Sequence, residues 1–574
     1  MRPLTLATAA ALAATVLGGC AGMYAGGDLG REREDTRLDR PGRLYALYLG
    51  GHSALNAGRS EEAAPMLAAA AAGAPGDPRI AERAFIAALL AGDVTRAAAL
   101  APAPEAANAA NQRLGRLVRA VEHLAEGRGR EAANELGAEM VGYPHRTAAA
   151  LVRPWALAQA GDLAAATLSP EAPRDRLLLV FGRRDRALML ERGRRHEEAE
   201  AAWKALREQA PASGLIALGY GEFLERRGRR EEAAELYRAH LRREQDEREI
   251  IAALERATAR RAAPALPSPA EGAAASLVAP AAALTAERQT ELALAYLRLA
   301  LRLDPRQDRA WLLTGDLLLA EKDASGARAA YRRVRPGSDG WAEAQARLAA
   351  SFEAEGNTAE ALRLVEAAAR AAPGDRTLQL AYADVLRAAE RWDESAAVLT
   401  GLIDRVEGEP DWRLLYLRGV AHDRGGRWAE AEADLQRARK LNPDDPELLN
   451  YLAYGWIDRG QRLTEALGMI EQAVARRPRS GALVDTLGWA HYRLGNLTEA
   501  VKHLERAVEL EPADPVINDH LGDAYWRAGR RTEAQFQWRR VLTLDPDAKV
   551  RADAERKLAS GMEAGSQPAR AAAP

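Results

Sequence analysis

The sequence contains very little cysteine. Cys20 is the only cysteine among 574 residues. A single thiol cannot form an intramolecular disulfide, so any exported domain of this chain must be stable through packing alone. A strong charge of either sign is also missing, since the formal net charge is -2. That balance gives no long-range field to attract nucleic acid or to steer acidic substrates.

Residue patterns typical of enzymes are absent as well. The nine histidines are scattered without an H-E-x-x-H pair, and no second cysteine is present to complete a zinc site. There is no Walker A sequence and no Gly-x-Ser-x-Gly motif. His491, in one of the most regular segments, is interpreted as a packing residue. We therefore expect a non-enzymatic protein with no catalytic residues, metal, cofactor, nucleic acid or small-molecule substrate.

No apolar run is long enough to cross a membrane, but a shorter one lies near Met1. Residues 4–16 are apolar or small and follow the positive charge of Arg2, whereas a membrane span needs about 20 such residues. The run is typical of the hydrophobic region of a signal peptide. It is followed by Leu-Gly-Gly-Cys, which ends at Cys20.

These four residues resemble the lipobox of bacterial lipoproteins. The resemblance implies that residues 1–19 are removed, that Cys20 receives a diacylglyceryl group and that its new amine is acylated. Acyl chains at about 0.8 kcal/mol per buried methylene hold a protein firmly on a bilayer. Asp after the cysteine commonly signals inner-membrane retention in that family, so Ala21 favours the outer membrane. The alternative is an ordinary signal peptide with a chance cysteine.

The rest of the chain repeats one unit. Gly488 and Gly522 are each followed twelve residues later by an alanine, and Pro512 and Pro546 follow those alanines. The alanine position recurs in steps of 33 to 36 residues, apart from one step of 60, with a serine in one place. Its members are Ala63, Ala97, Ala132, Ala166, Ala199, Ala233, Ala293, Ala327, Ala361, Ser395, Ala431, Ala466, Ala500 and Ala534.

This unit resembles the tetratricopeptide repeat, or TPR, which has two antiparallel helices in 34 residues, small residues at positions 8 and 20, and Pro at position 32. A large side chain at position 8 or 20 would overpack the helix pair by about 1–3 kcal/mol. No single repeat can bury its apolar face, so stacked repeats share one core. The expected fold class is an all-α TPR solenoid of about 13–14 helical hairpins in a right-handed superhelix.

The quality of the repeats divides the chain. We predict a signal peptide at 1–19, a lipidated flexible tether at 20–42 and a degenerate TPR array at 43–258. An Ala/Pro-rich linker is expected at 259–271, a second TPR array with a capping helix at 272–561, and a disordered tail at 562–574. The superhelix should be interrupted near 259–290, where Pro280 is expected to kink or shorten a helix.

The TPR resemblance also implies a partner surface on the concave side, at positions 2, 5, 9, 12 and 13 of the first helix of each repeat. In the last four repeats these positions are rich in Tyr, Trp and Arg, which dominate the energetics of interfaces. The alternative is that these aromatic side chains pack against the next repeat. The partner-binding candidates are Tyr416, Asn450, Tyr454, Asp485, Trp489, Tyr492, Arg493, Asp519, Asp523, Trp526 and Arg527.

A lipobox followed by a long TPR array resembles the lipoprotein adaptors that recruit a periplasmic C-terminal processing protease and deliver cell-wall hydrolases to it. The expected function is therefore a scaffold on the periplasmic face of the outer membrane, attached through its lipid alone, with a peptide or helix of a protein partner in its concave groove. The alternative is an assembly or export factor for pilus, secretin or polysaccharide-export machinery. The sequence does not separate these two functions.

Overall fold

The computed structural model describes residues 40–102, 109–137, 141–168, 175–244, 247–406 and 408–562. The predicted signal peptide, Cys20, the tether before residue 40 and the tail after residue 562 lie outside the described residues. The described residues form 30 α-helices and one short π-helix, η2, and contain no strand. The prediction of an all-α fold is confirmed.

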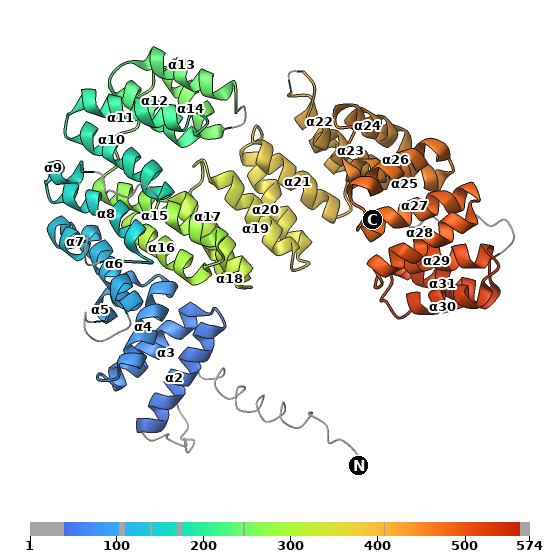
Figure 1. Ribbon diagram of the computed structural model, residues 1–574, viewed down its shortest axis with the longest axis horizontal. Helices are drawn as coiled ribbons and strands as arrows, with labels where there is room; N and C mark the ends of the chain where they lie inside the picture. Colours follow the sequence, from blue (N-terminus) through green and yellow to red (C-terminus); the bar gives the residue numbers. More distant parts are fainter. Residues whose placement is uncertain are drawn as a thin grey trace.

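The helices before residue 259 form the first array, and most of them are arranged as antiparallel pairs (Figure 1). They are α2 (Arg40–Asn56), α3 (Ser60–Gly73), α4 (Pro78–Ala91), α5 (Val94–Leu100), α6 (Ala109–Ala125), α7 (Gly129–Glu135), α8 (Arg146–Gln159), α9 (Leu163–Ala166), η2 (Leu178–Gly182), α10 (Arg183–Arg192), α11 (His196–Gln209), α12 (Gly214–Arg226), α13 (Arg230–Leu241) and α14 (Arg248–Thr258).

The helices after residue 268 form the second array, which ends in a single capping helix, α31. They are α15 (Pro269–Ala286), α16 (Thr290–Leu303), α17 (Asp308–Ala320), α18 (Ala324–Tyr331), α19 (Trp341–Glu353), α20 (Thr358–Ala371), α21 (Arg376–Ala388), α22 (Trp392–Ile403), α23 (Trp412–Arg424), α24 (Trp428–Leu441), α25 (Pro446–Arg459), α26 (Leu463–Arg476), α27 (Gly481–Leu494), α28 (Leu497–Leu510), α29 (Pro515–Arg527), α30 (Arg531–Val541) and α31 (Ala548–Ser560).

Close approach of the two helices explains the small residues of each repeat. A Cβ atom added to Gly488 of α27 would lie 2.6 Å from Leu504 Cγ of α28, and Ala500 beside it is fully buried. A side chain at position 488 would therefore push the two helices apart. Gly495 then adopts a φ of +83°, which ends α27 and turns the chain into α28.

The segment between the arrays begins without helical structure but soon becomes a long helix. Residues 261–268 are not helical, and the Ser268 side chain and the Pro269 ring begin α15. This helix then runs for 18 residues through Pro280. Of the two effects predicted for Pro280, a kink or a shortened helix, the shortening is wrong. Because α15 packs against both α16 and α8, tertiary contacts offset the lost backbone hydrogen bond.

The α15–α16 hairpin lies against the inner face of the first array (Figure 1). There α15 contacts α8, and α16 contacts α4 and α6. The indole Nε1 of Trp155 donates a hydrogen bond to Ser276 Oγ at 3.2 Å. Gly272 gives this indole room, because a Cβ at Gly272 would lie 2.3 Å from a ring carbon.

Polar contacts along α16 extend the same interface. Arg302 Nε donates to Glu122 Oε2 at 2.9 Å, and Arg298 Nε donates to the Leu90 carbonyl at 3.0 Å. Deeper in the contact, His145 Nδ1 and Tyr296 Oη are 2.8 Å apart. The inner face of α4, α6 and α8 is therefore already covered by a hairpin of the same chain.

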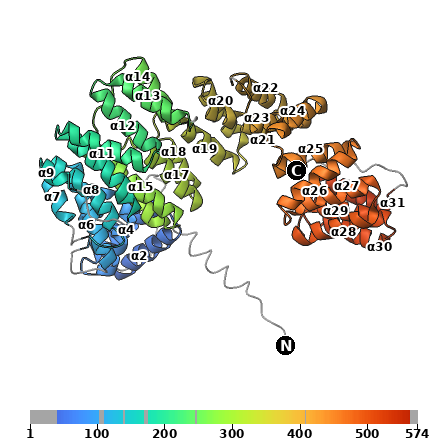
Figure 2. The same ribbon diagram turned by 45° about the horizontal axis from the view of Figure 1, so that its top comes forward.

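Packing divides the molecule differently from the sequence. A separate core from Ala187 to Ala257 lies within α10–α14. A larger core joins α2–α9 to α15–α19, from Ala54 to Leu348, and another runs from Leu415 to Trp538. The cores between them, in α19–α23, are three clusters of only four buried residues each. These helices form the bridge between two thicker bodies (Figures 1 and 2). We expect the bridge to be the most deformable part of the solenoid.

Candidate functional site

The partner-binding candidates of the last four repeats are mostly buried in the chain itself. Six are buried: Asn450, Tyr454, Asp485, Trp489, Tyr492 and Asp523. Four are partly exposed, namely Tyr416, Arg493, Asp519 and Trp526, and only Arg527 is exposed. Trp489 and Tyr492 are 2% and 1% exposed. The prediction that these two rings are open to a partner is wrong.

This burial results from contacts between the first helix of one repeat and the first helix of the next, such as α27 and α29. The Trp489 ring stacks on Tyr492 of its own helix, with centroids 4.5 Å apart, and on His520 of α29, at 4.1 Å. His520 Nδ1 lies 2.9 Å from Asp485 Oδ2, across the same α27–α29 boundary. Positions 5, 9 and 12 thus pack against the next repeat, which is the alternative that the sequence left open.

Electrostatics strengthen the α27–α29 contact. Burial by itself would lower the pKa of His520, but the adjacent Asp485 carboxylate outweighs that effect and raises the pKa above its ordinary value. The imidazole is therefore favoured in its charged form, paired with Asp485. Such a buried pair holds two repeats in register and leaves neither group for a partner.

A lysine of the capping helix α31 pairs with the aspartate side chains at the end of the array. Lys557 of α31 is 1% exposed, and its Nζ lies 2.7 Å from Asp519 Oδ2, 2.7 Å from Asp523 Oδ1 and 2.9 Å from Asp553 Oδ2. Burial disfavours the charged amine, yet the three carboxylates raise the pKa of Lys557. The cavity beside it is about 20 Å³, which is room for about one water molecule.

A larger open groove lies in the bridge. It is about 870 Å³, within the range of binding sites, and is lined by the first helices α19, α21 and α23. Its apolar lining includes Ala346, Ala350, Leu380, Ala381, Val385, Ala388 and Val420. The candidates taken from the sequence were polar and aromatic positions of the last four repeats, whereas this groove lies mainly in earlier repeats and its apolar lining is mostly aliphatic, with Trp392 as the aromatic residue among them.

Charged groups surround the apolar floor of the groove, and most are paired within the chain. Arg347 Nη1 lies 2.6 Å from Asp316 Oδ2 and its Nη2 lies 2.6 Å from Glu343 Oε1. Arg387 Nη1 lies 2.8 Å from Asp384 Oδ1. These exposed pairs are weak, so a partner could exchange them for its own charges. An apolar floor with a mixed polar rim is typical of a surface that accepts an amphipathic segment.

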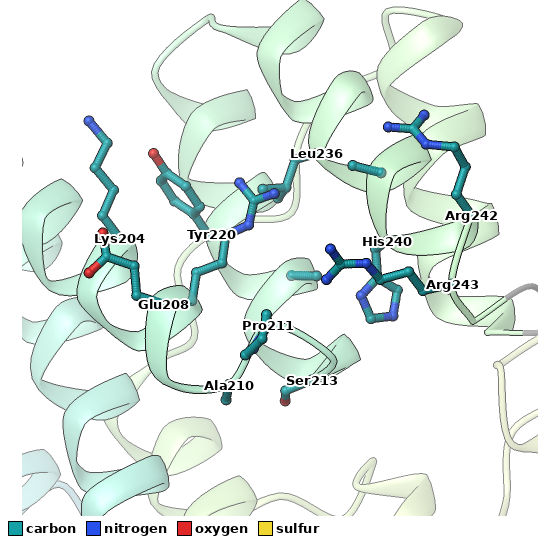
Figure 3. Close-up of a pocket in the computed structure, with 13 residues that line it drawn as sticks. Lys204, Glu208, Ala210, Pro211, Ser213, Tyr220, Leu236, His240, Arg242 and Arg243 are labelled. Atoms are coloured by element: carbon teal, nitrogen blue, oxygen red, sulfur yellow. The ribbon is translucent and has the colours of Figure 1, made fainter.

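A second hollow of about 490 Å³ lies between α11, α12 and α13. Arg242 and Arg243 lie on one side of it and Lys204 on the other, with Tyr220 between them (Figure 3). Lys204 already pairs with Glu200, at 2.8 Å. Because this hollow is little more than half as large as the groove, it is the weaker candidate.

The part of the chain that the structure describes contains neither a cluster of metal ligands nor a membrane-spanning helix. Among those residues, no group of three or more His, Cys, Asp and Glu side chains is placed to hold a metal ion. None of the helices described is long and apolar enough to span a membrane.

Stacked helical hairpins with an open inner groove define a helical-repeat protein of the scaffold class. Two family models, both described as tetratricopeptide repeat, match residues 271–545 and 184–248. Together these ranges cover more than half of the 574 residues. The chain belongs to the tetratricopeptide repeat family.

Similarity to individual proteins is limited in extent. The chain is 30% identical over 191 residues to the TPR repeat-containing protein PA4667 of Pseudomonas aeruginosa, and this covers 33% of this chain and 32% of that protein. It thus spans about a third of the curated relative. Among solved structures it is similar to the APC/C hetero-tetramer Cut9-Hcn1, at 14% identity, 91% and 97% coverage of the two chains and a TM-score of 0.39. It is also similar to a tetratricopeptide repeat protein from Parabacteroides merdae, at 14% identity and a TM-score of 0.38. That similarity covers 45% of this chain and 99% of the other.

Proposed function

We propose that this protein is a lipid-anchored scaffold of the periplasmic face of the outer membrane, and that it holds a segment of a protein partner in the groove of α19, α21 and α23. The observation that carries the partner site is the groove itself, about 870 Å³ with a small-residue apolar floor. The inner face of α4–α8 is covered by α15–α16, and the far end is filled by Lys557. A hollow of about 540 Å³ remains between α4, α6 and α16, and the groove is the better candidate because it is larger.

The anchor is supported by the Leu-Gly-Gly-Cys sequence ending at Cys20. If it is correct, intact mass of the membrane-extracted protein will show the loss of residues 1–19 and the added mass of the acyl groups. A mature terminus elsewhere with an unmodified Cys20 would show that the anchor is wrong. That outcome would leave the groove untouched, so the two parts of the proposal are tested separately.

The proposed partner is a C-terminal processing protease together with its cell-wall hydrolase substrates. Capture with the lipidated protein, followed by mass spectrometry, should recover a serine protease with those substrates. Recovery of a secretin or polysaccharide exporter instead would favour the assembly-factor alternative. Both results are compatible with a scaffold, and they differ in the partner complex that the scaffold binds.

The groove can be tested by filling it without touching the core. Ala350 of α19 and Ala388 of α21 line the groove and are exposed, so Ala350→Arg with Ala388→Arg should place two long charged side chains on its floor. We expect capture of the partner to weaken at least about tenfold, as on loss of an interface anchor, while the melting temperature stays near that of wild type.

The matched control uses the other helix of the same repeats. Ala367 of α20 and Ala397 of α22 are also exposed, but do not line the groove. Ala367→Arg with Ala397→Arg should capture the partner as well as wild type does. If the groove pair captures as well as this control pair, the partner binds elsewhere and the groove assignment is wrong.

A further inference from the structure

Helix α2 presents an apolar outer face at the start of the first array. Tyr45 and Leu49, one turn apart, are 68% and 55% exposed, and Ala46 between them is exposed as well. Nine large apolar side chains are exposed among the described residues, and α2 is the only helix that contributes two of them.

The position of α2 explains why this face has no cover. It is the first helix described, and its neighbours are α3 on one side and, more lightly, α4. In a repeat array the exposed side of a terminal repeat is normally polar, because no further repeat covers it. The other end obeys that rule, since α31 exposes Lys549, Glu555 and Arg556. We therefore expect the apolar face of α2 to be in contact with another surface, whereas the polar face of α31 can remain in water.

The chemistry of α2 favours a lipid surface as that cover. The helix has no acidic residue in residues 40–56, and Tyr45 and Leu49 lie on its exposed side. Tyrosine is enriched at the headgroup level of membranes, where its ring is buried and its hydroxyl is hydrated. The second half of the same face is polar, at Ser53 and Asn56.

We propose that Tyr45, Ala46 and Leu49 form a membrane-docking face that rests in the headgroup region of the bilayer. This inference rests on the proposed lipid anchor, because only 19 residues separate Cys20 from Arg40. Even fully extended, a chain of that length spans at most about 65 Å, so an acylated Cys20 would keep α2 within that distance of the lipid surface. The groove in α19, α21 and α23 lies far from α2 along the solenoid (Figures 1 and 2), so docking would leave it open to a partner.

A fluorescent probe at position 46 tests the docking face in the full-length protein. Acylation would occupy the Cys20 sulfur, so Ala46→Cys would supply the one free thiol for an environment-sensitive dye. On vesicles of phosphatidylethanolamine and phosphatidylglycerol, the dye on the lipidated protein should shift to the blue and be shielded from iodide. The same dye on Ala397→Cys, in α22, should stay in water. A probe at 46 that remains fully quenchable on bound vesicles would overturn the docking face while leaving the anchor intact.

The non-lipidated protein separates docking from anchoring. A chain that begins at Ala21, without the apolar run of residues 4–16 and without the lipid, should still partition weakly onto the anionic vesicles, and Tyr45→Ser with Leu49→Ser should lower that partition coefficient at least about tenfold. The control pair Leu441→Ser with Phe536→Ser removes exposed apolar side chains of α24 and α30 and should leave it unchanged. Equal losses in both pairs would overturn the proposal.

A second copy of the chain is the competing cover. In that case light scattering without vesicles would show a dimer that Tyr45→Ser with Leu49→Ser dissociates, and this result would overturn the membrane assignment. A monomer at all concentrations, with Leu49-dependent vesicle binding, would support it.

Discussion

Replacing Trp489 by alanine should destabilise the last repeats far more than it affects the rest of the molecule. The indole is 2% exposed and stacks on Tyr492 and His520, at centroid distances of 4.5 and 4.1 Å. Truncating a buried Trp typically costs 3–5 kcal/mol, and two ring stacks that add about 0.5–1.5 kcal/mol each keep this site above the lower end of that range. We expect a loss of about 4 kcal/mol.

The assay should resolve the chain along its length, because a long repeat array does not unfold as a single two-state unit. Hydrogen exchange with peptide-level mass spectrometry meets this need. A loss of about 4 kcal/mol corresponds to roughly a thousandfold faster exchange of the protected amides of α27 and α29. Peptides from α4, α6 and α8 supply an internal reference that should not change.

Two results would contradict this reasoning. Phe536→Ala serves as the control, since that ring is 60% exposed and its loss should leave exchange nearly unchanged. If Trp489→Ala exchanges like this control, Trp489 does not support the core. If it also loses partner capture, Trp489 is a binding residue, as the repeat positions first indicated.

Three further predictions concern contacts that hold the arrays together. Gly272→Ala should lower stability by about 1–3 kcal/mol, because the new methyl group would overlap the Trp155 ring; thermal melts against Ala270→Gly, on the same helix, would check this. Lys557→Met should increase hydrogen exchange in α31, at a cost of about 3–5 kcal/mol, since it leaves the buried Asp523 carboxylate and the partly buried Asp519 and Asp553 without this cation; unchanged exchange in α31 would contradict it. Burial lowers the pKa of His145 from 6.5 to about 4, so below pH 6.5 the unfolded chain takes up a proton that the folded chain does not, and stability falls with pH down to about 4. Between pH 7.5 and pH 5, the free energy of unfolding of wild type should fall by about 2 kcal/mol more than that of His145→Asn in denaturant titrations. Equal decreases in the two proteins would show that His145 does not titrate in this way.

The sequence alone determined the architecture of single repeats. Gly488 and Ala500 recur at a spacing that only a tight helical hairpin requires, because a larger side chain at either position overlaps the facing helix. Gly495 and Pro512 mark where helices end for reasons local to the backbone. Such constraints act within about 34 residues, so they can be read from the order of residues without knowledge of the rest of the chain.

Contacts between distant segments were decided only in the tertiary structure. Nothing in the spacing of Trp155 and Gly272 shows that α15 lies on α8, since the two are separated by more than 100 residues and their fit depends on the curvature accumulated over all the repeats between them. The same holds for Trp489: its position in the repeat predicts which side of the helix it lies on, but the coil of the solenoid decides whether the next repeat covers that side. Burial is a property of neighbours in space, and a partner surface is what remains after the chain has covered itself.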